Sequence, residues 1–235
     1  MIDRQLNYGR HLIKQFLKKA SPYETVLDIG AGGGTDLKLA KDVNPKAETF
    51  AIESYLPYVE NLRSQGITVY ELDIERDRLP FDDGTVDVVI VNQVLEHIKE
   101  IFWVFHEITR VVPVSGKVIV GVPNLASLHN RVLLAMGRQP STIRTNSAHV
   151  RGFTRGDVLK FLDDCFPHGY TLKGFGGSNF YPFPPVMARV LARIFPTMAW
   201  GIFFLLEKQR EYDDGFLSFP VRERLETNFW LGEGR

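Results

Sequence analysis

The chain has a single cysteine among its 235 residues, and it has no excess of either charge. Cys165 alone cannot form an internal disulfide or the cysteine cluster of a structural zinc site. This cysteine content fits a reducing, cytoplasmic setting. The 28 basic residues balance the 28 acidic ones, so no net field draws the protein towards nucleic acid or an anionic membrane.

Long apolar runs are also missing. The most apolar stretch, residues 186–206, is interrupted by Arg189, Arg193 and Pro196, whereas a membrane-spanning helix needs about 20 mostly apolar residues. We therefore expect no transmembrane span, which leaves only peripheral contact with a membrane open.

The N-terminal 20 residues are not a signal peptide, because charges interrupt every apolar run. They predict one amphipathic helix that Ser21-Pro22 ends. The residues expected on its apolar face are Ile2, Leu6, Ile13, Phe16 and Leu17.

Four glycines follow the first strongly apolar segment of the chain. Residues 25–29 predict a short strand that is buried on both faces, and glycines 30, 32, 33 and 34 come directly after it. Thr35 or Asp36 is expected to cap the helix that opens next. Free N–H groups at a helix N-terminus bind the polar backbone of a ligand, so this segment predicts a cofactor loop.

The spacing of these glycines separates two kinds of cofactor. A dinucleotide fingerprint requires Gly-x-Gly-x-x-Gly, and counting from Gly30 puts Thr35 at the third glycine position. Read as Gly30-Ala31-Gly32-Gly33-Gly34, with Asp28 two residues before the first glycine, the loop resembles motif I of the class I S-adenosylmethionine-dependent methyltransferases.

Two acidic positions support an adenosine ligand. Glu53 ends the second predicted strand (48–52) about 20 residues beyond the glycines, where an acid can accept both ribose hydroxyl hydrogens, and Ser54 lies beside it. The methyltransferase resemblance implies that Asp73, just after the third strand (67–70), binds the adenine amino group and that Ile74 lies against the ring. Taken alone, Asp73 also fits a solvated acidic surface.

The segment from Leu79 to Ile98 continues the resemblance. This segment consists of Leu79-Pro80-Phe81, an acidic turn and a valine-rich strand. It resembles the segment that precedes and forms the fourth strand of methyltransferases that act on small molecules. Asn92 and Gln93 end this strand, and ligands of open α/β sheets bind at such ends. We expect these amides to face the methionine part of the cofactor or the acceptor.

Glu96 and His97 raise the question of a metal. In O-methyltransferases of ubiquinone biosynthesis and of small-RNA end methylation, a Glu-x-x-Glu-His array binds a divalent ion, but here Gln93 occupies the first position. A neutral amide is a poorer ligand for a hard cation than a carboxylate is. The sequence therefore predicts no metal site, with His97 orienting the turn into the next helix.

The whole pattern predicts an α/β fold, a Rossmann-like three-layer sandwich. Its seven-stranded, mostly parallel sheet has an antiparallel last strand, an N-terminal helix and a lid inserted after the fifth strand. The remaining expected helices are 55–65, 101–111, 127–136, 155–165 and 185–195, and the remaining strands are 118–124, 170–175 and 199–207. The predicted domain covers residues 1–208, and residues 209–235 extend it and pack on it or on a partner subunit.

No aspartate or glutamate occurs between Ile108 and Gly156, although residues 71–107 hold ten acids and three bases. The middle of this acid-free segment, residues 124–153, is too long for an ordinary connection and leaves the sheet at its ligand edge. It predicts a lid for an acceptor that carries phosphate or carboxylate. The arginines expected to bind that group are Arg131, Arg138, Arg144 and Arg151. A solvated basic face is the alternative.

The lid ends in the segment His149-Val150-Arg151-Gly152-Phe153-Thr154. This segment is similar to one in methyltransferases that are found with the proteins of surface-glycan assembly, and in the related methionine-biosynthesis protein. The resemblance implies methyl transfer from S-adenosylmethionine, with S-adenosylhomocysteine as product, to a small-molecule, glycan or lipid-linked acceptor. His149 and His97 are candidate bases, because an unshifted imidazole titrates near neutral pH.

Three other functions stay open. The chain could be a nicotinamide dehydrogenase, although the glycine register is absent, or a non-catalytic cofactor-binding partner of another enzyme. A nucleic-acid methyltransferase is not expected, because Asn92-Gln93-Val94-Leu95 lacks the Pro-Pro-aromatic motif of base N-methylation. The sequence allows a monomer or a homodimer.

Overall fold

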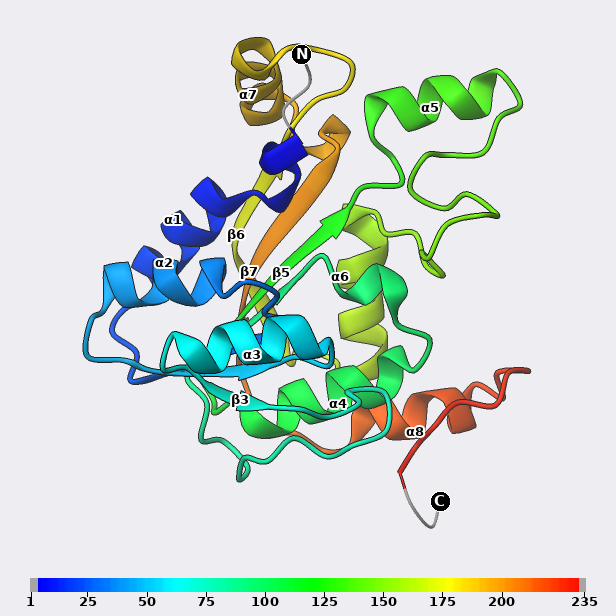
Figure 1. The fold of residues 1–235 in the computed structure, drawn as a ribbon. Helices are drawn as coiled ribbons and strands as arrows, with labels where there is room; N and C mark the ends of the chain where they lie inside the picture. Colours follow the sequence, from blue (N-terminus) through cyan, green and yellow to red (C-terminus); the bar gives the residue numbers. More distant parts are fainter. Residues whose placement is uncertain (1–3, 233–235) are drawn as a thin grey trace.

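The computed structural model describes residues 4–232, and its centre is one seven-stranded sheet (Figure 1). The strand order is β3-β2-β1-β4-β5-β7-β6. The strands are β1 (Thr25–Ile29), β2 (Glu48–Ile52), β3 (Thr68–Tyr70), β4 (Val88–Asn92), β5 (Lys117–Pro123), β6 (Tyr170–Ser178) and β7 (Gly201–Lys208). Strands β1 to β5 pair in parallel, and β7 runs antiparallel to both of its neighbours, β5 and β6. The predicted seven-stranded sheet with a reversed last strand is confirmed.

Helices cover both faces of this sheet. One face packs on α1 (Arg10–Ala20), α2 (Thr35–Val43) and α3 (Leu56–Ser64), and the other packs on α4 (Ile101–Val111) and α6 (Arg155–Cys165). Successive strand residues alternate between the two cores: in β1, Val26 belongs to the first and Leu27 to the second. Both faces are therefore dry, which explains why the central strands are apolar throughout.

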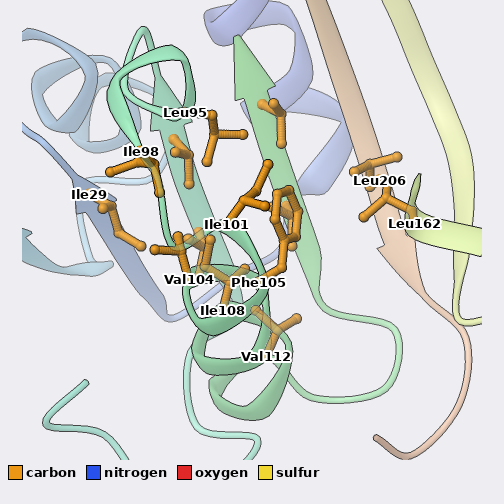
Figure 2. Close-up of a cluster of buried hydrophobic side chains, with 14 of the residues drawn as sticks. Ile29, Leu95, Ile98, Ile101, Val104, Phe105, Ile108, Val112, Leu162 and Leu206 are labelled. Atoms are coloured by element: carbon orange, nitrogen blue, oxygen red, sulfur yellow. The ribbon is translucent and has the colours of Figure 1, made fainter. Parts of the chain in front are cut away.

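The core between the sheet and α4 fixes the position of the cofactor edge (Figure 2). Ile101, Phe105 and Ile108 of α4 lie against side chains of the sheet, and Leu162 reaches the same core from α6. All 11 residues of α4 are buried, because other segments cover the side that faces away from the sheet. Arg110 donates to the carbonyl oxygens of Leu79 and Phe81, and His106 is hydrogen-bonded to Tyr212. The helix that follows Tyr212, α8 (Gly215–Arg222), packs along α4.

The N-terminal segment differs from the prediction of one continuous helix. A 3-10 turn, η1 (Arg4–Tyr8), precedes α1, and Gly9 separates the two with a φ of 54°. A left-handed residue cannot continue a right-handed helix, and the ring of Phe203 occupies the space that a Cβ at Gly9 would need. Leu6, Ile13, Phe16 and Leu17 are buried as expected, whereas Ile2 lies outside the described residues.

The short 3-10 turn η2 (Leu95–His97) lies between β4 and α4. The remaining elements come after β5 and are α5 (Leu128–Ala135), α7 (Pro185–Ile194) and the 3-10 turn η3 (Pro196–Met198). Figure 1 shows α5 and α7 at one end of the molecule and α8 at the other. Within residues 4–232, no helix is long and apolar enough to cross a membrane.

Candidate cofactor and acceptor site

The glycine loop lies between the end of β1 and the start of α2. Gly30, Gly32 and Gly34 all have positive φ, of 72°, 52° and 74°. A Cβ at Gly30 would meet Val94 and one at Gly34 would meet Leu62, so these two glycines allow close packing. A Cβ at Gly32 would meet no protein atom within 4 Å, so the main chain there borders open space. The predicted caps Thr35 and Asp36 were wrong, because Gly34 is the N-cap and no side chain caps the helix.

Glu53 lies beside this loop. Its Oε2 accepts a hydrogen bond of 2.8 Å from the N–H of Gly32, and its Oε1 accepts one of 2.9 Å from the N–H of Ser54. The N–H groups of Gly30 and Ala31 donate to the carbonyl oxygen of Ile52, so the loop is also attached to the main chain of β2. The ends of β1 and β2 thus hold the acid and the glycine N–H groups in one place, as the sequence predicted for a ribose site.

Asp28 is buried in β1 below the loop. Burial raises its pKa well above the ordinary range, and the nearby charges of Asp36 and Glu53 raise it further, whereas Arg10 acts in the opposite direction. Asp36 accepts a 2.8 Å hydrogen bond from Nδ2 of Asn92, which also donates to the carbonyl oxygen of Tyr8. The amide nitrogen of Asn92 is therefore engaged with α2 and the N-terminal segment.

Asp73 and Ile74 follow β3 at the same edge of the sheet. Asp73 is exposed, and its Oδ1 accepts a 2.9 Å hydrogen bond from the N–H of Glu75, which shapes the turn. Ile74 is half-buried and packs against the core on α4. The loops after β1, β2 and β3 thus place all the predicted adenosine ligands at the carboxyl edge of the sheet.

The turn after β4 carries a cluster that the sequence did not predict as a unit. The carboxylate of Glu96 and ring nitrogens of His97 and His149 lie within 4.8 Å of one another. Burial raises the pKa of Glu96 to about 8, and the pKa of His97 is lowered by partial burial and by the nearby His149. Gln93 begins the turn with a φ of 59°, and its buried Nε2 has no hydrogen-bond partner among residues 4–232.

The lid is anchored at both ends. Leu125 N–H donates to the carbonyl oxygen of Phe153, and the N–H of Val150 donates to that of Glu96. Within the lid, the buried side chain of Asn130 accepts from the N–H of Ser141 and donates to Oγ1 of Thr142, which ties the loop back to α5. The lid is therefore a built structure with its own polar interior.

The four predicted acceptor arginines differ in their surroundings. Arg131 donates to the carbonyl oxygen of Ala126, and Arg151 donates to those of Ile98 and Lys99. Arg138 and Arg144 are exposed, and the charge of Arg144 helps to lower the pKa of His129, after the larger effect of burial. The main-chain contacts of Arg131 and Arg151 hold the lid in shape, so Arg138 and Arg144 are the freer pair.

A cavity of about 880 Å³ lies between α5 and the segment before α7. None of the four arginines lines it. Its walls are Asn7, Leu128, His129, Val132, Leu133, Ser141, Tyr181, Pro182, Phe183 and Trp200. Trp200 directly precedes β7, which pairs antiparallel with β5, so the cavity lies near the carboxyl end of β5. A second cavity, of about 980 Å³, lies at the amino ends of β2 and β3, which is the wrong edge for a cofactor.

The family of the chain follows from comparison with known proteins. The model of the family described as methionine biosynthesis protein MetW matches residues 10–150, which is more than half of the chain. The chain belongs to the MetW family. The part that this MetW match covers runs from α1 through the glycine loop and β5 into the lid.

Curated relatives include proteins named as methyltransferases. A Mycobacterium tuberculosis protein named a probable S-adenosylmethionine-dependent methyltransferase is 27% identical over 159 residues, which are 67% of this chain and 54% of that protein. This chain spans about half or less of the length of the curated relatives that it matches.

Solved structures show the same fold. A chain of the Haloferax volcanii complex between the Trm112 methyltransferase activator and a methyltransferase is 17% identical, with a TM-score of 0.60 and coverage of 87% of this chain and 92% of that one. Geranyl diphosphate methyltransferase, solved with S-adenosylmethionine, is 13% identical, with a TM-score of 0.56 and 85% coverage of each chain. The predicted fold of the class I S-adenosylmethionine-dependent methyltransferases is thus confirmed.

Sequence reasoning missed two features of this site. It considered Glu96-His97 without His149, because nothing in the spacing shows that the end of the lid returns to the turn after β4. It also missed the aromatic wall of the 880 Å³ cavity, where Tyr181 and Trp200 lie with ring centroids 5.9 Å apart. The only signal for that wall was the density of aromatic and proline residues between 180 and 185.

Proposed function

We propose that the chain transfers the methyl group of S-adenosylmethionine to an acceptor that binds under the lid. The observation that carries this proposal is the geometry at Gly32: a main-chain N–H at positive φ borders open space and lies 2.8 Å from the carboxylate of Glu53. A ligand with a ribose and a polar chain fits that arrangement, because the carboxylate accepts hydroxyl hydrogens and the loop allows close approach.

The chain's own residues have simple tasks in such a reaction. The cofactor supplies a methyl group on a positively charged sulfur, which is already activated for displacement. Glu53 and Asp73 would hold its adenosine part, and Gly30, Ala31, Gly32 and Gly34 would shape the bed beneath its methionine part. The lid would hold the acceptor in line and exclude water, because alignment is the main requirement of a displacement of this type. His97 or His149 would take a proton where the acceptor has one to lose.

The cavity of about 880 Å³ is the acceptor site in this proposal. Its lining is mainly apolar and aromatic, whereas His129 and Ser141 are hydrogen-bonded to each other on the lid side. Arg144 is exposed, and its positive charge acts on His129 in the cavity wall, so we expect it to attract an anionic group of the acceptor. This combination favours an acceptor with an apolar body and an acidic head group, and a cytoplasmic reaction is part of the proposal.

A lipid-linked acceptor is favoured over a free one by the surface of α5 and α7. Val132, Leu134 and Met136 are exposed on α5, and Val186, Met187, Val190 and Ile194 are exposed on α7. The exposed residues Arg189 and Arg193 lie among them, and residues 165–206 contain no acid, like residues 108–156. Apolar side chains beside cations on an acid-free end of the molecule fit an anionic membrane surface.

We therefore expect the protein to sediment with vesicles of phosphatidylglycerol and phosphatidylcholine, but not with phosphatidylcholine alone, and to dissociate as salt is added. Val190→Asp should lower the partition coefficient about tenfold or more, because it places a charge among side chains that enter the lipid. Val221→Asp is the matched control, since Val221 is also exposed (65%, against 53% for Val190) but lies on α8, at the other end of the molecule (Figure 1). Equal sedimentation of the two variants would remove the lipid surface from the proposal.

The proposed activity is tested with methyl-labelled S-adenosylmethionine. We expect the isolated chain to bind S-adenosylmethionine and not NADH in isothermal titration, and to move label into lipid-linked or glycan intermediates that carry an acidic group. Binding of NADH instead would favour a dehydrogenase. Cofactor binding without label transfer to any acceptor of these classes would favour the non-catalytic partner protein.

A further inference from the structure

Two histidines and a glutamate meet where the lid returns to the sheet. Glu96 and His97 belong to η2, directly after β4, and His149 comes from the end of the lid. The three ligating atoms lie within 4.8 Å of one another, and the two imidazole rings meet edge to face with centroids 4.7 Å apart. The N–H of Val150 donates to the carbonyl oxygen of Glu96, which holds His149 beside the turn.

Both histidines have the tautomer that a metal ligand needs. Nδ1 of His149 lies 2.7 Å from the carbonyl oxygen of Thr142, and Nδ1 of His97 lies 3.3 Å from that of Ala148. A carbonyl oxygen only accepts, so each ring donates its hydrogen from Nδ1 and keeps the lone pair on Nε2. A main-chain carbonyl behind the ring is the usual support of a metal-binding histidine, because it fixes the orientation and raises the basicity of the other nitrogen.

Glu96 provides an independent observation. Its side chain is 1% exposed, and its Oε2 has no hydrogen-bond partner within the described part of the chain. A buried polar oxygen without a partner is costly, and a buried carboxylate more so, unless a cation lies beside it. The neighbours of this carboxylate in the cluster are the two imidazoles, each with a ring nitrogen that lies within 4.8 Å of a carboxylate oxygen of Glu96.

We propose that Glu96, His97 and His149 form a three-ligand site for a divalent transition-metal ion of the zinc type. Two nitrogens and one carboxylate are a ligand set of catalytic zinc, whereas magnesium and calcium prefer oxygen ligands alone. Ligand atoms about 2.0–2.2 Å from one tetrahedral zinc ion lie about 3.3–3.6 Å apart, so rotation of the side chains about their χ angles must draw the three atoms, now within 4.8 Å, together on the ion. Gln93 need not ligate.

Three protein ligands leave a fourth coordination position open. His97 is the most exposed of the three residues, so that position faces the solvent side of the turn, at the carboxyl edge of the sheet. An acceptor oxygen bound there would lose its proton more readily, and the ion would then replace the His97 or His149 imidazole as the group that assists proton loss, because both imidazoles are ligands. This consequence rests on the proposed function, whereas binding of the ion does not.

The test uses the full chain, freed of metal by EDTA and dialysis. Titration with Zn²⁺ against a competing chelator should show one ion per chain, and Co²⁺ should give the visible absorption of a tetrahedral nitrogen-oxygen site. His97→Ala, His149→Ala and Glu96→Gln should each lower the affinity for Zn²⁺ about 100-fold or more, because each removes one ligand. His11→Ala is the matched control, since it removes a histidine far from the cluster.

Circular dichroism and S-adenosylmethionine affinity show whether each variant is folded, and Glu96→Gln keeps the size of the side chain in case a histidine variant fails to fold. The site is supported if the parent chain and His11→Ala bind one ion per chain and every folded cluster variant loses this binding. Absence of stoichiometric binding by the parent chain overturns it, and so does equal affinity in the parent and the cluster variants. A parent chain that binds the ion but transfers no label to any acceptor would count against the proposed function and leave the metal site intact.

Discussion

Gly32→Val should abolish measurable binding of S-adenosylmethionine, a loss of at least about 100-fold in affinity, in a protein that stays folded. A side chain at this position meets no protein atom within 4 Å, so nothing in the fold resists it apart from the φ of 52°. The branched side chain instead fills the space in which we place the ligand. Isothermal titration measures the loss, and circular dichroism checks the fold.

The strain of a branched residue at positive φ must be separated from occlusion of the site. Gly66 provides the control, because its φ is 75° and a Cβ there would also meet no atom within 4 Å. Gly66→Val carries a similar strain, of about 1–2 kcal/mol, in the turn between α3 and β3. It should lower thermal stability as much as Gly32→Val does and keep full affinity. Normal binding by Gly32→Val would show that the loop is not the cofactor bed.

Glu53→Ala should lower the affinity for S-adenosylmethionine by about 1.5–3 kcal/mol, or about 10–150-fold, because two ribose hydroxyl groups lose a charged acceptor. The carboxylate also accepts from the N–H groups of Gly32, Ser54 and Tyr55, so part of any loss could come from the loop itself. A cofactor analogue without the ribose hydroxyls separates the two effects. If Glu53 accepts hydrogen bonds from the ribose hydroxyls, Glu53→Ala should lower the affinity for that analogue far less than it lowers the affinity for S-adenosylmethionine.

Glu48→Ala is the control for this cycle, because Glu48 begins the same strand at the opposite edge of the sheet. It should leave both affinities unchanged. An equal effect of Glu53→Ala on the cofactor and on the analogue would mean that Glu53 supports the loop and does not contact the ribose.

Much of the fold was predictable because its signals are local. The apolar strands, the glycine turn after β1 and the order of strands and helices follow from the pattern of neighbouring residues, and so does the association of Gly32 with Glu53. Parallel strands bring their carboxyl ends to one edge, so an acid at the end of β2 must lie near a loop at the end of β1. That inference requires only the topology.

Helix ends and helix faces were less predictable. Thr35 and Asp36 are good capping residues, yet Gly34 is the N-cap, with a left-handed φ of 74°. Residue 34 packs so closely against Leu62 and Ile67 that only glycine fits there. Likewise, Gly9 breaks the predicted N-terminal helix because the ring of Phe203 in β7 takes the space beside it. In both places a residue distant in sequence decides the local conformation, and propensity alone is outweighed.

The sequence by itself determined the sheet, the cofactor edge and the family resemblance, since each depends on residues close together in the chain. Only the tertiary structure decided that residues 77–83 and the C-terminal segment cover the outer side of α4, that Arg151 binds the main-chain carbonyls of Ile98 and Lys99, and that His149 lies beside Glu96 and His97. Each of these features is a contact between segments that are far apart in the chain. Their geometry depends on how the lid and the C-terminal segment fold back onto the domain. That course of the chain is fixed by packing and hydrogen bonds between distant residues, which no short stretch of sequence contains.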